Sequence, residues 1–503
     1  MLLAAGLAVG DQVLVQAIES AGLRFDTLEG AGWSVHGATA RIGWRDSHHT
    51  SVQFEAAAAF LPGPLGTVNA VSVSCPKARI ETDSVHCQHA EIRAHSDRFG
   101  PQAMTAGFDY SVATGRLAFR LDGVRFAGGG LSASGVIDAP AWDVQLQGED
   151  LQLEALPGAL SAVGVVLPGL EGSGLLDVTS RLSGAASGFA DGHLVVRLAA
   201  EAFSDETGAL AGENLGLQLE GDIARSAQGW KVSADLESIR GQFYAEPVFL
   251  DLDAQPVHAK AVLEWQPEHG RLLVKSLEYH QRQTMALQLS GSLRPGQPVP
   301  VDSLQVSVKA GRFPALYDTW LQPWLNETLL ADMETAGEID AGAVIRSGEL
   351  ESLELALHDV DMADRGERFG LDGVNGSLSW SRDDTRHVQE LAWDSGHVYR
   401  VSLGEAFIAT QSVASRFALR EPASIDVLDG KLMIDALEVD YGEGGVRRWF
   451  VDGILTPVSM RDLTRALGWP EFAGKLSGVI PEVRYQDGVL EVGGMLLVRV
   501  FDG

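Results

Sequence analysis

The chain has 503 residues, of which 45% are hydrophobic and 21% charged, and this composition is globular rather than disordered. Its 38 basic and 68 acidic residues give a net charge of −30, which repels phosphate backbones, so we expect no nucleic-acid partner. The length suggests roughly three domains, unless the chain is an elongated repeat in which each unit contacts only its neighbours.

The chain begins with a short apolar run, Leu2 to Val9. A membrane-spanning helix needs about 20 apolar residues, and a secretory signal begins with positive charges that this run lacks. The run is typical of the end of a longer apolar segment, although an ordinary buried helix is the alternative. Apolar spacing over residues 11–23 predicts a helix that ends near Gly22.

Alternating apolar and polar residues dominate the chain after residue 23. Such alternation places apolar side chains on one face of a strand and polar side chains on the other. Gly, Asn, Asp and Pro interrupt the pattern roughly every 8 to 15 residues. We therefore predict an antiparallel meander with one sheltered face. The clearest apolar positions on that face are Phe119, Trp142, Val144, Leu146, Leu353, Leu355 and Leu357.

The two cysteines, Cys75 and Cys87, lie 12 positions apart in a stretch that predicts a hairpin with its turn at residues 82–84. A disulfide closing this loop would contribute about 3 kcal/mol in the chain-entropy model and would require an oxidising compartment. Free buried thiols are one alternative. A metal site with His86 and His89 is another, but the spacing matches no common zinc motif.

Two later segments predict helices. Residues 313–333, FPALYDTWLQPWLNETLLADM, carry a broad aromatic stripe, and Pro323 would begin or kink a second helical piece. Such a stripe is typical of packing and could cap the end of a sheet. Residues 459–468, SMRDLTRALG, begin with Ser459 as a plausible N-cap.

Motifs for catalysis do not stand out in the sequence. It contains no HExxH, GxSxG or P-loop pattern, and GAGWSV lacks the third glycine of a dinucleotide fingerprint. We therefore expect a protein that is not an enzyme, with no catalytic residues, no cofactor and no metal site.

The feature that recurs along the sequence is instead the apolar face of the predicted strands. A long sheet with one apolar face must cover that face with a second sheet or curl it into a trough. A trough lined by Leu, Val, Phe and Trp would suit an acyl chain, because about 15 methylenes exposed to water cost on the order of 12 kcal/mol.

Four stretches resemble the AsmA-like superfamily of bacterial envelope proteins, and within it the YdbH-type and TamB-related branch. The most specific pattern is GxLSGxIP followed by a strand, a turn and FDG. The stretches are GRFPALYDTWLQPWL (311–325), DVDMADRGERFGLDGVNGSLSW (359–380), LAWDSG (391–396) and GKLSGVIPEVRYQDGVLEVGGMLLVRVFDG (474–503).

This resemblance implies a mainly β fold in which a long antiparallel, curled β-sheet forms an elongated hydrophobic groove, with a few short helices. It implies a periplasmic body anchored to the inner membrane by an N-terminal anchor. It also implies transport of phospholipid, with the acyl chains in the groove, in support of outer-membrane lipid homeostasis, and it allows an outer-membrane protein as a partner.

On this basis we expect four segments and a fragment of a longer protein, because the anchor is incomplete and the last strand stops where the family pattern would continue. The segments are a remnant of the signal anchor plus a helix (1–23), the N-terminal part of the groove (24–310), a helical segment (311–335) and the C-terminal part of the groove (336–503).

Two other functional classes remain open. An envelope assembly or secretion scaffold would act through β-augmentation at exposed sheet edges, and it predicts a filled core with a free edge strand. An extracytoplasmic hydrolase or sugar binder predicts a pocket with clustered carboxylates and aromatic residues. A lipid conduit predicts apolar residues along a concave face.

Overall fold

The computed structural model describes residues 19–30, 33–46, 49–61, 66–162, 164–165, 169–442, 445–486, 489–493 and 495–500. The chain divides into two compact units, Met1–Val196 and Arg197–Gly503, and the boundary falls within strand β11 (Gly188–Asp205). The sequence pattern does not predict this boundary.

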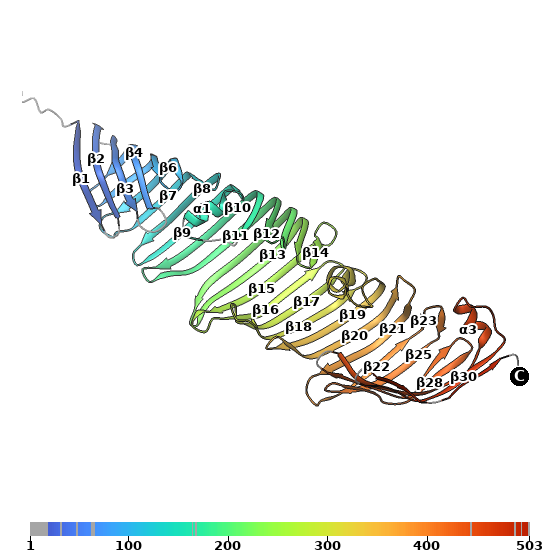
Figure 1. Cartoon of the computed structure of the whole chain (residues 1–503). Helices are drawn as coiled ribbons and strands as arrows, with labels where there is room; N and C mark the ends of the chain where they lie inside the picture. Colours follow the sequence, from blue (N-terminus) through green and yellow to red (C-terminus); the bar gives the residue numbers. More distant parts are fainter. Residues whose placement is uncertain are drawn as a thin grey trace, which may run out of the picture. The chain divides into compact units, whose positions relative to one another are not determined.

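The first unit is a meander of antiparallel strands in which each strand pairs with the next along the chain (Figure 1). Helix α1 (Leu156–Ala162) joins β9 to β10. The strands are β1 (Ser20–Gly30), β2 (Trp33–Asp46), β3 (His49–Leu61), β4 (Gly66–Ile80), β5 (Ser84–Ser96), β6 (Gly100–Ser111), β7 (Leu117–Phe126), β8 (Gly129–Asp138), β9 (Ala141–Gln152) and β10 (Leu170–Ala185).

In its described residues, the second unit has the same antiparallel pattern and four short helical elements at strand ends. These are the 3-10 turn η2 (Pro267–His269), the π-helical turn η3 (Tyr317–Leu321), α2 (Gln322–Leu325) and α3 (Met460–Ala466). The strands are β12 (Leu210–Ser226), β13 (Gly229–Ala245), β14 (Val248–Asp251), β15 (Val257–Gln266), β16 (Arg271–Gln281), β17 (Met285–Leu293), β18 (Val301–Arg312), β19 (Met333–Arg346), β20 (Glu349–Asp364), β21 (Phe369–Ser381), β22 (Arg386–Trp393), β23 (Ser395–Val398), β24 (Val401–Leu403), β25 (Ala406–Val413), β26 (Arg416–Leu419), β27 (Ala423–Val427), β28 (Gly430–Gly442), β29 (Gly445–Ser459), β30 (Gly474–Gln486), β31 (Val489–Val492) and β32 (Met495–Val500).

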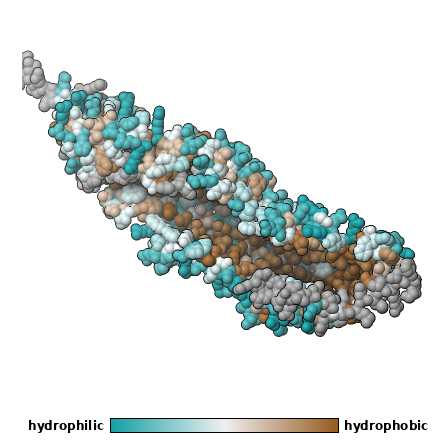
Figure 2. All heavy atoms as spheres, in the orientation of Figure 1, coloured by the Kyte–Doolittle hydropathy of each residue, from teal (hydrophilic) through white to brown (hydrophobic). Residues whose placement is uncertain are grey.

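The register of the strand pairs identifies two faces in each unit, because residues directly opposite each other on neighbouring strands point the same way. We call the face with Phe119 in the first unit, and with Leu355 in the second, the inner face. In the second unit the inner face is hollowed, and apolar surface, brown in Figure 2, gathers in the hollow over the strands that are yellow to orange in Figure 1. The predicted mainly β, antiparallel, curled fold with an apolar groove is therefore confirmed.

The strand ends of the second unit form two margins. Strands β18 and β29 end at one of them, which also carries η3, α2 and α3, and we call it the helical margin (Figure 1). Antiparallel pairing places the ends of β15 and β21 at the opposite margin, which we call the open margin.

The sheet changes partners at Gly376, which lies opposite Leu357 on β20 and Leu391 on β22. Its φ of 144° and the nearby carbonyl oxygen of Glu390, which a Cβ would strike, require glycine here. Only three residue pairs join β21 to β22, and β22 then pairs along its whole length with β25. The pairing therefore divides at this point between β22 and β23, and Leu357, Gly376 and Leu391 keep the inner face in register.

The two later helix predictions are confirmed. Helix α3 lies within 459–468 with Ser459 at its N-cap position, although the Ser459 backbone N–H, not its side chain, makes the polar contact, donating to Asp429 at 2.6 Å. Within residues 313–333 only η3 and α2, Tyr317 to Leu325, are assigned as helical elements, and Pro323 lies in the first turn of α2. A proline fits there because the first helical N–H groups need no partner within the helix.

The first helix prediction is wrong at its end, and one helix was not predicted. Residues 20–23 belong to β1, which pairs with β2, so alternation in this stretch outweighed the helical spacing. Residues 1–18, with the apolar run, lie outside the described residues. Helix α1 was missed because its seven residues are too few to show a helical period.

Candidate functional site

The inner face of the first unit brings together the four apolar positions predicted there. Phe119 on β7 lies opposite Gly135 on β8, and Gly135 lies opposite Val144 on β9. Trp142 and Leu146 flank Val144 at two-residue spacing, so they share its face. All four predicted side chains are half-buried, and the Trp142 indole donates a hydrogen bond of 3.3 Å to the last carbonyl of β10.

A disulfide joins Cys75 on β4 to Cys87 on β5, with 6.3 Å between the Cα atoms. The predicted bond is confirmed, and β4 and β5 form the predicted hairpin. Because the two sulfurs bond each other, neither is available as a metal ligand. Cys87 lies opposite Phe108, which lies opposite Phe119, so the disulfide is part of the inner face.

In the second unit the predicted residues Leu353, Leu355 and Leu357 form one half-buried row on the inner face of β20. Both neighbouring strands continue this row. The residues opposite it are Ala343, Ala341 and Ile339 on β19, and Trp380, Leu378 and Gly376 on β21. Further apolar residues follow in register on β18, β17 and β16, namely Val306, Val308, Leu287, Leu289 and Leu277.

Burial differs between the two margins of this face. Near the helical margin the inner side chains form a closed core, whose buried members are Val360, Val374, Trp393, Ala406 and Ile425. Toward the open margin the inner side chains, such as Leu353 and Leu355, are only half-buried. The hollow is therefore a groove with one packed wall and one accessible wall.

The helical segment packs onto the inner face from the helical margin. Trp320 in η3 donates its indole N–H to Gln281 at 2.8 Å and lies edge-on to the Tyr279 ring, with 5.8 Å between ring centroids. Burial raises the pKa of Tyr279 above its ordinary value. Tyr317 anchors the segment's other end, because its hydroxyl donates to the Leu330 carbonyl at 2.6 Å. The aromatic stripe therefore packs against strand ends at the helical margin.

Polar residues interrupt the apolar lining on β22 and β25. Gln389 is 1% exposed, and its amide donates to the Ser379 carbonyl at 2.6 Å and to the Ser412 hydroxyl at 2.7 Å. Its side-chain oxygen accepts from Thr410 at 2.6 Å. Sequence reasoning missed this patch, although Gln389 shares the alternation of the apolar Trp393. The side chains satisfy one another, so an apolar ligand meets no unpaired donor from Gln389.

The charged residues of the sheet lie mainly outside this lining and pair with one another. A hollow of about 510 Å³ on β25 to β29 is lined by Glu438, Asp440 and Phe450, among other residues. Asp440 lies 3.9 Å from Arg416 and 3.5 Å from Arg448. This carboxylate is therefore engaged in ion pairs rather than free to act as an acid or base.

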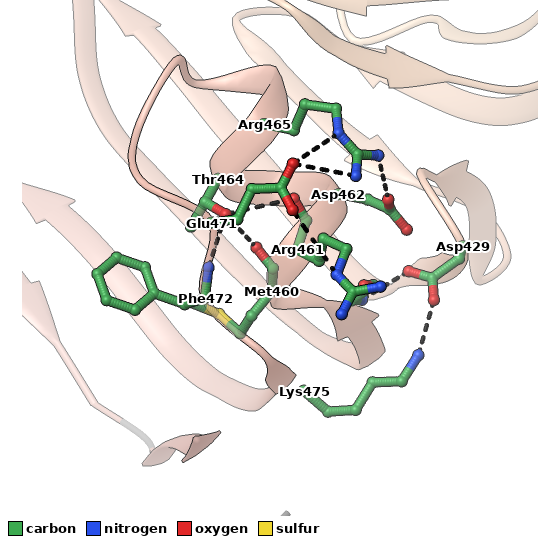
Figure 3. A network of polar contacts seen from close by, with 10 residues as sticks. Asp429, Met460, Arg461, Asp462, Thr464, Arg465, Glu471, Phe472 and Lys475 are labelled. Atoms are coloured by element: carbon green, nitrogen blue, oxygen red, sulfur yellow. Dashed lines mark hydrogen bonds and ion pairs between the residues drawn. The ribbon is translucent and has the colours of Figure 1, made fainter. Parts of the chain in front are cut away.

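A polar network holds α3 and the link that follows it at the helical margin (Figure 3). Arg465 contacts Asp462 at 3.1 Å and Glu471 at 3.3 Å. Lys475, at the start of β30, contacts Asp429 at 2.7 Å. These pairs are exposed, so each contributes little stability alone. Together they fix the link between β29 and β30.

Comparison with known proteins adds no identification. No family model matches the chain, and no curated protein is significantly similar to it. Among the residues that the structure describes, no helix is both long enough and apolar enough to cross a bilayer. The same residues bring together no group of three or more His, Cys, Asp or Glu side chains suited to a metal ion. The main functional candidate is the apolar inner face, whose side chains align across neighbouring strands and stay half-buried.

Proposed function

We propose that the protein conducts phospholipids between two membranes, with their acyl chains in the inner-face groove. The observation that carries this proposal is the half-burial of apolar side chains such as Leu353, Leu355 and Leu357. A filled sandwich would bury these side chains, and a solvated sheet would not align them across neighbouring strands. A groove that stays accessible to a mobile apolar ligand explains both why these side chains are only half-buried and why they align across neighbouring strands.

The energy scale fits this ligand. An acyl chain of about 15 methylenes costs on the order of 12 kcal/mol in water, and an apolar groove removes most of that barrier. A polar exterior with a net charge of −30 would keep such a groove soluble. The transfer itself requires no catalytic residue and no cofactor, so we propose a transport protein and not an enzyme.

The cellular setting follows from the same reasoning. The Cys75–Cys87 bond fits an oxidising compartment such as the periplasm. From the resemblance to AsmA-like proteins of the YdbH type, we propose that such a conduit lies between the inner membrane, reached through an N-terminal anchor, and an outer-membrane protein partner. In this setting the protein would support outer-membrane lipid homeostasis.

The test is photo-crosslinking in cells from Val144 and Leu355, followed by mass analysis of the adducts. Matched controls carry the crosslinker at Gln145 and Glu354, which are exposed on the outer face of the same strands. Phospholipid adducts from the two inner positions, and none from the outer ones, are the expected result. Protein adducts alone from Val144 and Leu355 would contradict lipid conduction and favour an envelope assembly scaffold.

A further inference from the structure

The four most exposed large hydrophobic side chains among the described residues all lie at the helical margin of the second unit, with exposed fractions from 61% to 69%. They come from three links: the one between β18 and β19, the turn between β23 and β24, and the one between α3 and β30. The turn lies at this margin because Val398, which precedes it, pairs with Phe369 at the start of β21. The four side chains, which we call the exposed band, are Trp324, Leu329, Tyr399 and Trp469.

Contacts between these links place them side by side at the margin. The Leu329 carbonyl accepts a hydrogen bond of 3.4 Å from the Arg368 guanidinium, and the Arg368 carbonyl accepts one of 2.7 Å from the Tyr399 backbone N–H. The Arg400 guanidinium reaches the end of α3, where it lies 3.7 Å from the position that a Cβ on Gly468 would occupy. The exposed tryptophan of this link follows Gly468 directly. Contiguous exposed apolar surface of this kind is typical of an interaction site.

The arginines beside the exposed band are paired with carboxylates, with one exception. The exception is Arg400, which has no ion-pair partner in the part of the chain that the structure describes. It follows Tyr399 and reaches the residue before Trp469, so an unpaired guanidinium lies within the exposed band. Such a group can donate to phosphate oxygens. The pairs are Arg365 with Asp332, Arg368 with Asp364, and both Arg461 and Arg465 with Glu471.

We propose that the exposed band docks the second unit onto the surface of a lipid bilayer. Tryptophan and tyrosine combine an apolar ring with one polar group, so they concentrate where hydrocarbon meets lipid headgroups. Leu329 adds aliphatic surface, and Arg400 supplies a donor for a headgroup phosphate. A second copy of the chain fits less well, because two molecules of net charge −30 repel each other, whereas a zwitterionic bilayer repels neither. This docking goes beyond lipid conduction, because it requires no lipid in the groove.

The first test is flotation of the full chain with phosphatidylcholine vesicles. The double variant Tyr399→Ser and Trp469→Ser should lower the partition coefficient about tenfold, because two exposed rings no longer leave water on binding. The control is the double variant Val299→Ser and Tyr441→Ser, which removes exposed apolar side chains at the open margin and should leave binding unchanged. A wild type that does not float, or an equal loss in the two double variants, would overturn the docking.

A groove variant separates docking from lipid conduction. Leu355→Glu places a charge on the inner face, away from the exposed band, so its flotation should match that of the wild type. If Leu355→Glu abolished flotation and the double variant Tyr399→Ser and Trp469→Ser did not, the vesicles would bind through the groove and docking would be contradicted. Unchanged flotation of Leu355→Glu supports docking whether or not the groove holds lipid, so a failure of conduction and a failure of docking are distinguishable.

Photo-crosslinking in cells from Trp324 and Trp469 identifies the occupant of the exposed band. We expect phospholipid adducts from both positions, and these should persist in Leu355→Glu because they do not depend on lipid in the groove. Adducts to a second copy of this chain would instead make the exposed band a dimer contact. Adducts to other proteins, with no phospholipid, would assign it to a protein partner, and either result would overturn docking on a bilayer.

Discussion

Trp320 and Gln281 lie 39 residues apart in the chain and are joined by a hydrogen bond of 2.8 Å from the indole N–H to the side-chain oxygen. Gln281 is fully buried, and the same oxygen also accepts from the Tyr279 hydroxyl at 3.2 Å. Gln281 in turn donates to Gln255 at 2.8 Å. This chain of contacts ties the helical segment to the strand ends and closes the packed wall of the groove.

Removing the indole N–H should loosen that wall. Trp320→Phe keeps an aromatic ring against Tyr279 but deletes one hydrogen bond to a buried acceptor, which costs about 1 kcal/mol. Hydrogen exchange of the η3 and α2 amides should quicken correspondingly. Trp324→Phe is the control, because Trp324 is 69% exposed. Equal exchange in both variants would show that the hydrogen bond to Gln281 does not hold the segment.

The disulfide should stabilise the first unit. The double variant Cys75→Ala and Cys87→Ala opens a loop of 12 residues, which should lower the free energy of unfolding by about 2 to 3 kcal/mol. Denaturant unfolding of the wild type with and without a reducing agent provides the check. The free energy of unfolding of the reduced wild type should approach that of the variant. If a reducing agent leaves the free energy of unfolding of the wild type unchanged, the disulfide does not stabilise the first unit.

Local alternation was sufficient to predict the inner face. Leu353, Leu355 and Leu357 could be placed because a period of two depends only on neighbouring residues, and antiparallel pairing then aligns each row with the next. The same is true of Phe119 and Val144. The pairing of the two cysteines was predictable because both lie within one hairpin.

Features that depend on distant pairing could not be predicted. The docking of Trp320 on Gln281 requires the two intervening strands, β17 and β18, and a chain reversal to be in place first. Gln389 shows a different limit, because its two-residue spacing from Trp393 indicates its face, but the partners that allow a polar side chain to be buried there lie on other strands. The exposed band likewise depends on contacts between three links that are distant in the sequence.

A charge in the groove should impair lipid binding without unfolding the sheet. Leu355→Glu places a carboxylate on the inner face at a half-buried position, where an acyl chain would have to desolvate it, so bound phospholipid should fall about tenfold. Gln305→Glu adds the same charge at an exposed outer position of β18 and should retain the lipid. Lipid extraction with mass quantification compares the two. Full lipid retention in Leu355→Glu would contradict an acyl-chain path over β20.

Asp364 should make stability depend on pH in the acid range. Hydrogen bonds from the Arg368 side chain, at 2.5 and 2.8 Å, lower the pKa of Asp364 to about 2. Because this pKa lies below the unfolded value of about 4, the carboxylate stabilises the fold above pH ~4, and its contribution is lost as the pH falls from ~4 to ~2.

The check is urea unfolding of the wild type and of Asp364→Asn from pH 2 to pH 6. The stability difference between them should be constant above pH ~5 and shrink steadily below pH ~4. Asp332→Asn removes an exposed partner of Arg365, 3.6 Å away, and should change stability little at any pH. If the difference in stability between the wild type and Asp364→Asn does not vary between pH 2 and pH 6, the lowered pKa of Asp364 is contradicted.

The polar patch around Gln389 should be structural and not part of lipid recognition. Gln389→Leu preserves volume but removes the amide that bridges Ser379, Ser412 and Thr410, so we expect a loss of about 2 to 3 kcal/mol and faster hydrogen exchange in β22 and β25. Gln411→Leu, on the outer face of β25, should cost much less. Because Gln389→Leu makes the lining more apolar, bound phospholipid per folded molecule should stay the same or rise. A fall in bound phospholipid with unchanged stability would instead assign the patch to contact with the lipid.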